Sequence, residues 1–78
     1  MKFNFKYRDV EKTEDFGSIR EAILYSMYQA YHIDLEIDEQ IQFIVPGSKW
    51  IYFCIMKHDG PQAGRLIEEK DFTPDKSN

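Results

Sequence analysis

The chain is 78 residues long, with a formal net charge of −4 and one Trp, five Tyr and six Phe. This length can bury one core but not two, and so small a core is marginal unless aromatic packing, a disulfide, a metal or a partner subunit adds to it. The lone cysteine, Cys54, excludes an internal disulfide, and no cluster of ligand-type residues predicts a metal or another cofactor. No apolar run approaches the roughly 18 residues of a membrane span and no secretory signal opens the chain, so we expect a cytoplasmic protein without a membrane segment.

The first predicted elements are a strand and a loop. Phe3, Phe5 and Tyr7 alternate with polar residues, which is typical of a half-buried strand over residues 3–7. Residues 11–17 are polar and have no period, which predicts a connecting loop.

A helix is predicted to begin after Ser18 and to end near His32. Ser18 and Glu21 have the spacing of a capping box, in which both side chains accept hydrogen bonds from backbone N–H groups. Apolar residues then recur at helical spacing. Either the helix has more apolar surface than one partner face covers, or its three tyrosines lie at the rim with their hydroxyls in water. These tyrosines are Tyr25, Tyr28 and Tyr31.

The second half of the chain is predicted to be mostly extended. From Ile33 apolar residues recur at every second position, which predicts a short extended approach at 34–38 and a strand at 40–45, with a bend at Asp38 and Glu39. The remaining segments are a tight turn at 45–48, a strand at 49–57, a loop at 58–64, an edge strand at 65–69 and a disordered tail at 73–78.

The predicted fold is therefore a single α+β domain over residues 1–72, in the order β-α-β-β-β, with one helix packed on an antiparallel sheet of three or four strands. One helix covers only one face of a sheet, whereas the strand at 49–57 is apolar on both faces. A second copy of the chain, a fold-over of the N-terminal segment or another protein must cover the other face. The two candidate sets are Ile51, Phe53 and Ile55 on one side, and Trp50, Tyr52, Cys54 and Met56 on the other.

The net charge is concentrated in residues 34–39, DLEIDE. Residues 1–33 and residues 49–78 each contain five acids and five bases, so the charge of −4 equals the four acids of this stretch. An extended backbone would place alternate acids about 6.6 Å apart on one side, which is of the order of phosphate spacing in nucleic acid. The line is either a solvated edge that discourages strand pairing or a ridge that enters a basic groove of a partner. The four acids are Asp34, Glu36, Asp38 and Glu39.

No pattern in the sequence predicts catalysis. Cys54 and His58 would lie about 13 Å apart on a strand, too far to share a zinc ion. The spaced glycines of 60–65 lack the Lys-Ser/Thr pair and the helix of a phosphate-binding loop. An RNA-stacking platform at Trp50 and Tyr52 would lack the usual motif and would lie near the acids, so we do not expect nucleic acid as a partner.

The sequence thus predicts a small non-enzymatic module that binds another protein with a basic surface. Such a module would serve as an inhibitor or regulator, an acidic DNA mimic of the kind that phages and other mobile elements direct against host enzymes. The alternative is a structural or assembly subunit that forms a homodimer through an aromatic sheet face, and a nucleic-acid-binding sheet is third. The predicted partner-binding residues are the four acids together with Trp50 and Tyr52.

Overall fold

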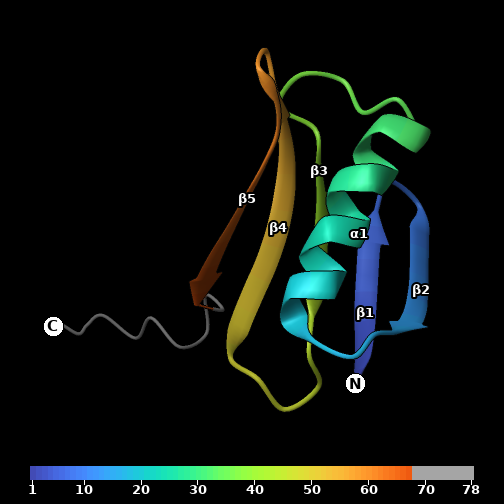
Figure 1. The fold of residues 1–78 in the computed structure, drawn as a ribbon, viewed down its shortest axis with the longest axis vertical. Coiled ribbons are helices and arrows are strands. Elements are labelled where there is room, and N and C mark those ends of the chain that lie inside the picture. Colours follow the sequence, from blue (N-terminus) through green and yellow to red (C-terminus); the bar gives the residue numbers. More distant parts are fainter. Residues whose placement is uncertain (68–78) are drawn as a thin grey trace, which may run out of the picture.

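The computed structural model of the protein describes residues 1–67. Five strands form one antiparallel sheet in the order β2-β1-β3-β4-β5, and the helix lies across one face of it (Figure 1). The predicted α+β class is confirmed, as is the order β-α-β-β-β, into which one further strand is inserted before the helix. The predicted tail at 73–78 and the domain end at residue 72 lie outside the described residues. The elements are β1 (Lys2–Tyr7), β2 (Val10–Asp15), α1 (Ile19–His32), β3 (Gln40–Ile44), β4 (Trp50–Lys57) and β5 (Gly60–Ile67).

The sheet has five strands, not three or four, because most of the predicted loop 11–17 is a strand and only residues 16–17 of it connect β2 to the helix. β2 pairs with β1 along its whole length, from Lys2 opposite Asp15 to Tyr7 opposite Val10. As an edge strand without an apolar face, β2 carries no hydrophobic alternation, so its sequence resembles that of a loop.

The last strand also begins earlier than predicted. β5 starts at Gly60, so the predicted loop 58–64 shrinks to a turn at His58 and Asp59. Gly60 has a φ of 116°, a conformation that glycine adopts without steric cost and that closes this short hairpin.

The core is aromatic, as the composition predicts for so small a domain. Phe3, Phe5 and Phe43 are almost fully buried, and the Phe43 ring stacks on Phe5 with ring centres 4.9 Å apart. The helix faces them with small side chains, Ala22 and Ala30 among them, which let its backbone approach the sheet closely. Dense packing thus takes the place of the excluded disulfide.

The predicted helix is confirmed from Ile19 to His32, and its N-terminal cap differs in one detail. The hydroxyl of Ser18 accepts a hydrogen bond from the backbone N–H of Glu21 at 3.2 Å, as predicted. The Glu21 carboxylate, however, accepts from the N–H of Gly17 at 3.0 Å. Both side chains still satisfy backbone donors at the helix start.

The helix covers the face of β4 that carries Tyr52, Cys54 and Met56, all of them buried. The opposite face, with Ile51, Phe53 and Ile55, has no helix over it among the described residues. We call this side of the sheet the open face. Its three β4 side chains are half-buried by their neighbours within the sheet.

Candidate protein-binding surface

The acidic stretch does not form the extended line that we predicted. Residues 34–39 make two turns, and Asp34 and Asp38 have φ values of 53° and 72°. Leu35, between them, is only 7% exposed and packs into the core. The prediction failed because the alternation of apolar residues resembles a strand, whereas aspartate readily adopts positive φ in turns.

Glu39 has a basic partner, Arg8, which corrects our expectation that all four acids of this stretch are unpaired. Its two carboxylate oxygens accept hydrogen bonds from the Arg8 guanidinium at 2.7 and 2.8 Å. Arg8 also donates to the backbone carbonyls of Ile33 and Asp34, at 3.1 and 3.2 Å. The hydrogen bonds from Arg8 and from the backbone N–H of Glu36 lower the pKa of Glu39 from 4.5 to about 2. Glu39 therefore holds the loop closed.

Asp38 is compensated as well. The Lys57 ammonium donates a hydrogen bond to its carboxylate at 2.6 Å, and this bond lowers the pKa of Asp38 below its usual value. Asp34 and Glu36 are exposed and form no ion pair with any residue of the described range 1–67. Two of the four predicted acids thus have no ion-pair partner among the described residues.

Trp50 and Tyr52 do not form the free aromatic face that we predicted for docking. Tyr52 is 7% exposed, and its ring stacks on Phe43 with ring centres 5.3 Å apart, beneath the helix. Trp50 is half-buried against the core, with the Arg65 guanidinium 4.4 Å from the centre of its ring. The helix packs on this face of β4, and the sequence alone did not predict which of the two faces it would cover.

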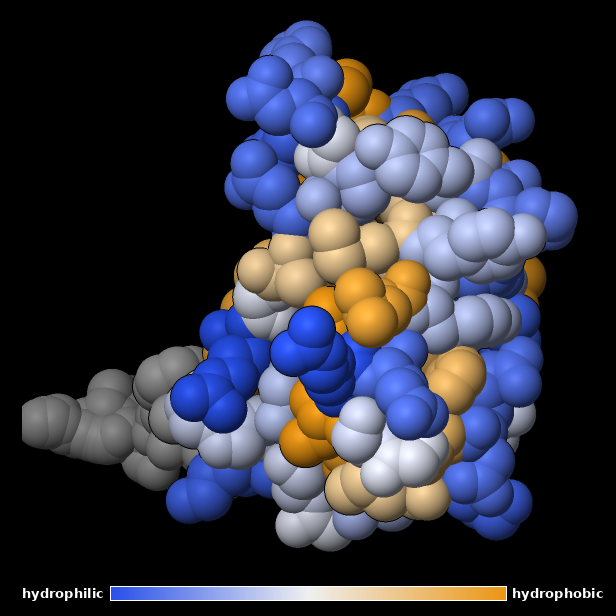
Figure 2. All heavy atoms as spheres, viewed as in Figure 1, coloured by the Kyte–Doolittle hydropathy of each residue, from blue (hydrophilic) through white to orange (hydrophobic). Residues whose placement is uncertain are grey.

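A different set of large side chains is exposed over the helix. Leu24, Tyr28 and Tyr31 are spaced along one stripe of α1 and are 56%, 64% and 63% exposed, and Ile37 in the following loop is 45% exposed. Together with Asp34 and Glu36 these residues make up what we call the aromatic–acidic surface. Figure 2 shows pale and orange side chains, with deep blue ones among them, over the middle of the molecule on this side, and blue ones at the end where loop 33–39 lies.

The excess of tyrosines in the helix was the sequence signal for this surface, although our prediction did not assign binding to them. Tyr28 stacks on His32 with ring centres 5.9 Å apart, so its ring is held in place while it remains in water. A rigid aromatic ring loses little conformational entropy on binding, which is why tyrosine is common at protein interfaces.

The surface ends in a hollow of about 600 Å³ between the end of α1 and the β4–β5 turn. The walls of the hollow are an aromatic ring, from Tyr31, and the apolar side chains of Ile37 and Met56. Two carboxylates also line it, those of Glu36 and Asp59. Lys57 and His58 also line it, and Lys57 is held by Asp38. The hollow therefore combines apolar walls with acids, which suits the stem and the charged head of an arginine or lysine.

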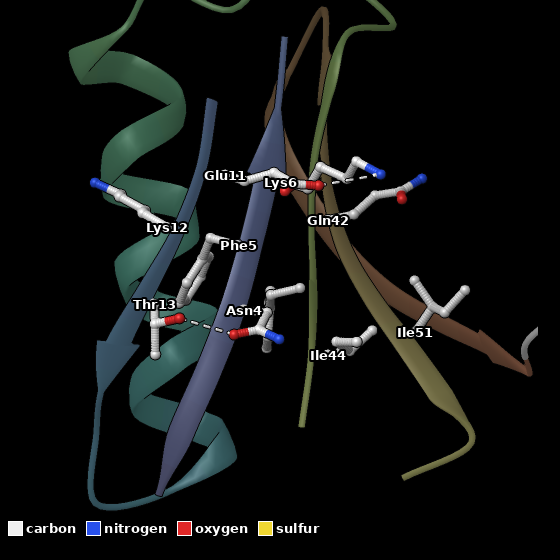
Figure 3. A pocket seen from close by; sticks show the side chains of 10 residues that line it. Asn4, Phe5, Lys6, Glu11, Lys12, Thr13, Gln42, Ile44 and Ile51 are labelled. Carbon is white, nitrogen blue, oxygen red and sulfur yellow. Dashed lines mark hydrogen bonds and ion pairs between the residues drawn. The ribbon is translucent and has the colours of Figure 1, made fainter. Parts of the chain in front are cut away.

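A second hollow, of about 490 Å³, lies on the open face (Figure 3). Ile44 and Ile51 lie side by side on β3 and β4, next to Asn4 and Gln42. The side chain of Lys12 points away from them, toward Tyr25 at the rim of the helix. The open face here is thus a mixture of aliphatic and neutral polar groups with one ion pair, Lys6 and Glu11, at 3.4 Å.

Metal binding and nucleophilic chemistry each require a particular cluster of side chains. Among residues 1–67, no three His, Cys, Asp or Glu side chains lie close enough to hold a metal ion. Cys54 is buried, and burial raises the pKa of its thiol, so it is a poor nucleophile. No helix in this part of the chain is long and apolar enough to cross a membrane.

Comparison with known proteins gives no family assignment. No protein-family model matches the chain, and no curated protein and no solved structure matches it. The functional argument therefore depends on the geometry of the two surfaces.

Proposed function

We propose that this protein is a non-enzymatic protein-binding module whose aromatic–acidic surface docks a partner with a basic surface. The observation that carries the proposal is the exposure of Leu24, Tyr28, Tyr31 and Ile37, each between 45% and 64%, along one stripe of α1 and in the loop that follows it. Contiguous exposed apolar and aromatic side chains with a polar border are typical of interaction sites.

Charge decides the kind of partner. Asp34 and Glu36 border the patch without an ion pair inside the described chain, and Glu36 and Asp59 line the hollow next to Tyr31. An approaching basic surface gains from these acids, whereas an acidic one is repelled. Because the acids do not form an evenly spaced line, the proposal depends on an aromatic contact with an acidic border rather than on mimicry of a phosphate backbone.

The proposal is tested by capture from a lysate of the source cell, with the wild-type chain and two variants. The double variant Tyr28→Ser/Tyr31→Ser removes both exposed rings without touching the buried core. Val10→Ser, at an exposed position on β2, is the matched control for loss of surface apolar area. We expect the wild type and Val10→Ser to capture the same protein and the double variant to capture at least about tenfold less of it.

A second experiment removes the two acids and varies the salt concentration. We expect Asp34→Asn/Glu36→Gln to weaken capture at low salt and to matter much less at high salt, because screening removes the contribution of these acids. Asparagine tolerates the positive φ of Asp34, so this variant keeps the loop conformation. Capture that is unaffected by either double variant would contradict the proposal.

A further inference from the structure

The open face carries an apolar stripe that no described element covers. Ile44 lies opposite Ile51, and Ile51 lies opposite Leu66, so the stripe crosses three strands. Phe53 and Ile55 continue it along β4. Leu66 is 46% exposed and the others are partly exposed. Such a stripe on a sheet face is normally covered by a second layer.

The charges on the open face cancel within the chain. Lys2 pairs with Asp15 at 3.7 Å and Lys6 with Glu11 at 3.4 Å, between neighbouring positions of β1 and β2. Lys57, at the end of β4, is paired with Asp38. The other polar groups on this side of the strands are neutral: Asn4, Thr13, Gln40, Gln42 and Gln62. Each charged side chain on this face thus has a partner of opposite sign within residues 1–67, and Asp15 also accepts a hydrogen bond from the N-terminal ammonium at 3.0 Å.

We infer that the open face is the interface of a homodimer, in which a second copy of the chain covers the stripe. A two-fold contact brings a patch against the same patch of its partner, so a surface with net charge repels its copy and a neutral one does not. On the aromatic–acidic surface Asp34 and Glu36 form no ion pair within residues 1–67 and would repel a second copy, whereas the charged side chains of the open face are paired. This inference is independent of the proposed function, because the two surfaces lie on opposite sides of the sheet.

The size of the face sets the strength of the dimer. Five strands about 4.8 Å apart and about 20 Å long give a footprint of roughly 500 Å². A standard specific interface buries about 800 Å² on each partner and the range begins at about 600 Å², so this face lies just below the range, among weak and transient contacts. We therefore expect a reversible dimer with a dissociation constant in the micromolar range.

Gln42 offers a test that spares the fold. It is exposed at the middle of the central strand β3, on the open face and next to Ile44 (Figure 3). Gln42→Glu or Gln42→Lys gives the two facing surfaces of the dimer the same added charge, and we expect either variant alone to weaken the dimer at least about tenfold. An equimolar mixture of the two variants places opposite charges there, and we expect the mixture to recover association.

Sedimentation equilibrium of the full chain over roughly 1–500 μM measures these constants. Ile51→Thr, which shortens the stripe, should also weaken the dimer, and Val10→Thr, the same kind of change off the open face, should leave it within about twofold. A wild-type chain that stays monomeric throughout, because another segment or another protein is the true occupant, would overturn the inference. So would variants that dimerise as the wild type does, or a mixture that associates no better than either variant alone.

Discussion

Arg8 determines the shape of the acidic loop. Its guanidinium makes two hydrogen bonds to Glu39 and one each to the carbonyls of Ile33 and Asp34. The planar fork of an arginine can hold a carboxylate and two carbonyls at once, which a lysine ammonium does less well. Arg8 and Glu39 are 31 positions apart, and neither lies in a periodic pattern, so no sequence signal predicted that this acid would be neutralised.

The Glu39 contact predicts a pH-dependent stability. The pKa of Glu39 is lowered in the folded protein from 4.5 to about 2, so the ionised form is the one that folding favours. The contribution of ionised Glu39 to the free energy of unfolding is fully present above about pH 5. It is lost as the pH falls through the range from 4.5 toward 2. We expect the Tm of Glu39→Gln to be a few degrees below that of the wild type at pH 7, and the gap to narrow as the pH is lowered to 2.

Glu36→Gln is the matched control, because Glu36 has no ion pair within the described residues. Its Tm should follow the wild type across the same range. Thermal unfolding monitored by circular dichroism at several pH values measures both variants. If the difference in Tm between Glu39→Gln and the wild type is the same at pH 7 and pH 2, the assigned contact between Glu39 and Arg8 is contradicted.

At the scale of elements, the sequence predicted those whose residues repeat with a clear period and missed those that do not. The helix, β1, β3 and β4 have apolar positions at helical or alternate spacing, and each is confirmed. β2 was missed because an edge strand can be polar on both sides. Loop 33–39 was misassigned because its apolar alternation is accidental: Leu35 is buried and Ile37 is 45% exposed.

The packing of β4 against β5 depends on one glycine. Gly64 lies opposite Phe53, and a Cβ at residue 64 would lie 2.7 Å from Cζ of that ring. We expect Gly64→Ala to displace the Phe53 ring and to lower the free energy of unfolding by about 1 kcal/mol. In a Phe53→Val background the ring is absent, and there Gly64→Ala should be neutral or slightly stabilising, because alanine restricts the unfolded chain. Urea unfolding of the four chains gives the interaction energy, and equal effects in both backgrounds would contradict the contact.

At the scale of the whole molecule, the structure separates two surfaces that the sequence could not tell apart. The sequence showed that β4 is apolar on both faces and that the helix has more aromatic residues than one contact needs. It could not show which face of β4 the helix covers, because both sets of side chains are of similar size and polarity. The structure places Tyr52 under the helix, with Trp50 half-buried on the same face of β4, and leaves Ile51, Phe53 and Ile55 on the open face.

Each surface is therefore expected to have its own occupant. The aromatic–acidic surface has exposed rings and acids without an ion pair in residues 1–67, which favour a basic partner, and the open face has an apolar stripe and paired charges, which favour a second copy. Since the two surfaces face opposite ways, both can be occupied at once (Figure 1). A dimer would present two copies of the aromatic–acidic surface, which raises the apparent affinity for a partner with repeated sites.

Site-specific photo-crosslinking tests this arrangement most directly. A photoreactive phenylalanine analogue replaces Tyr28 on the helix in one chain and Gln62 on the open face in another, and each is irradiated in a lysate of the source cell. We predict that the probe at 28 joins the chain to a different protein, with less product at high salt, and that the probe at 62 joins two copies of the chain. Identical products from the two positions, or no product from residue 28, would contradict the assignment of a partner to the aromatic–acidic surface.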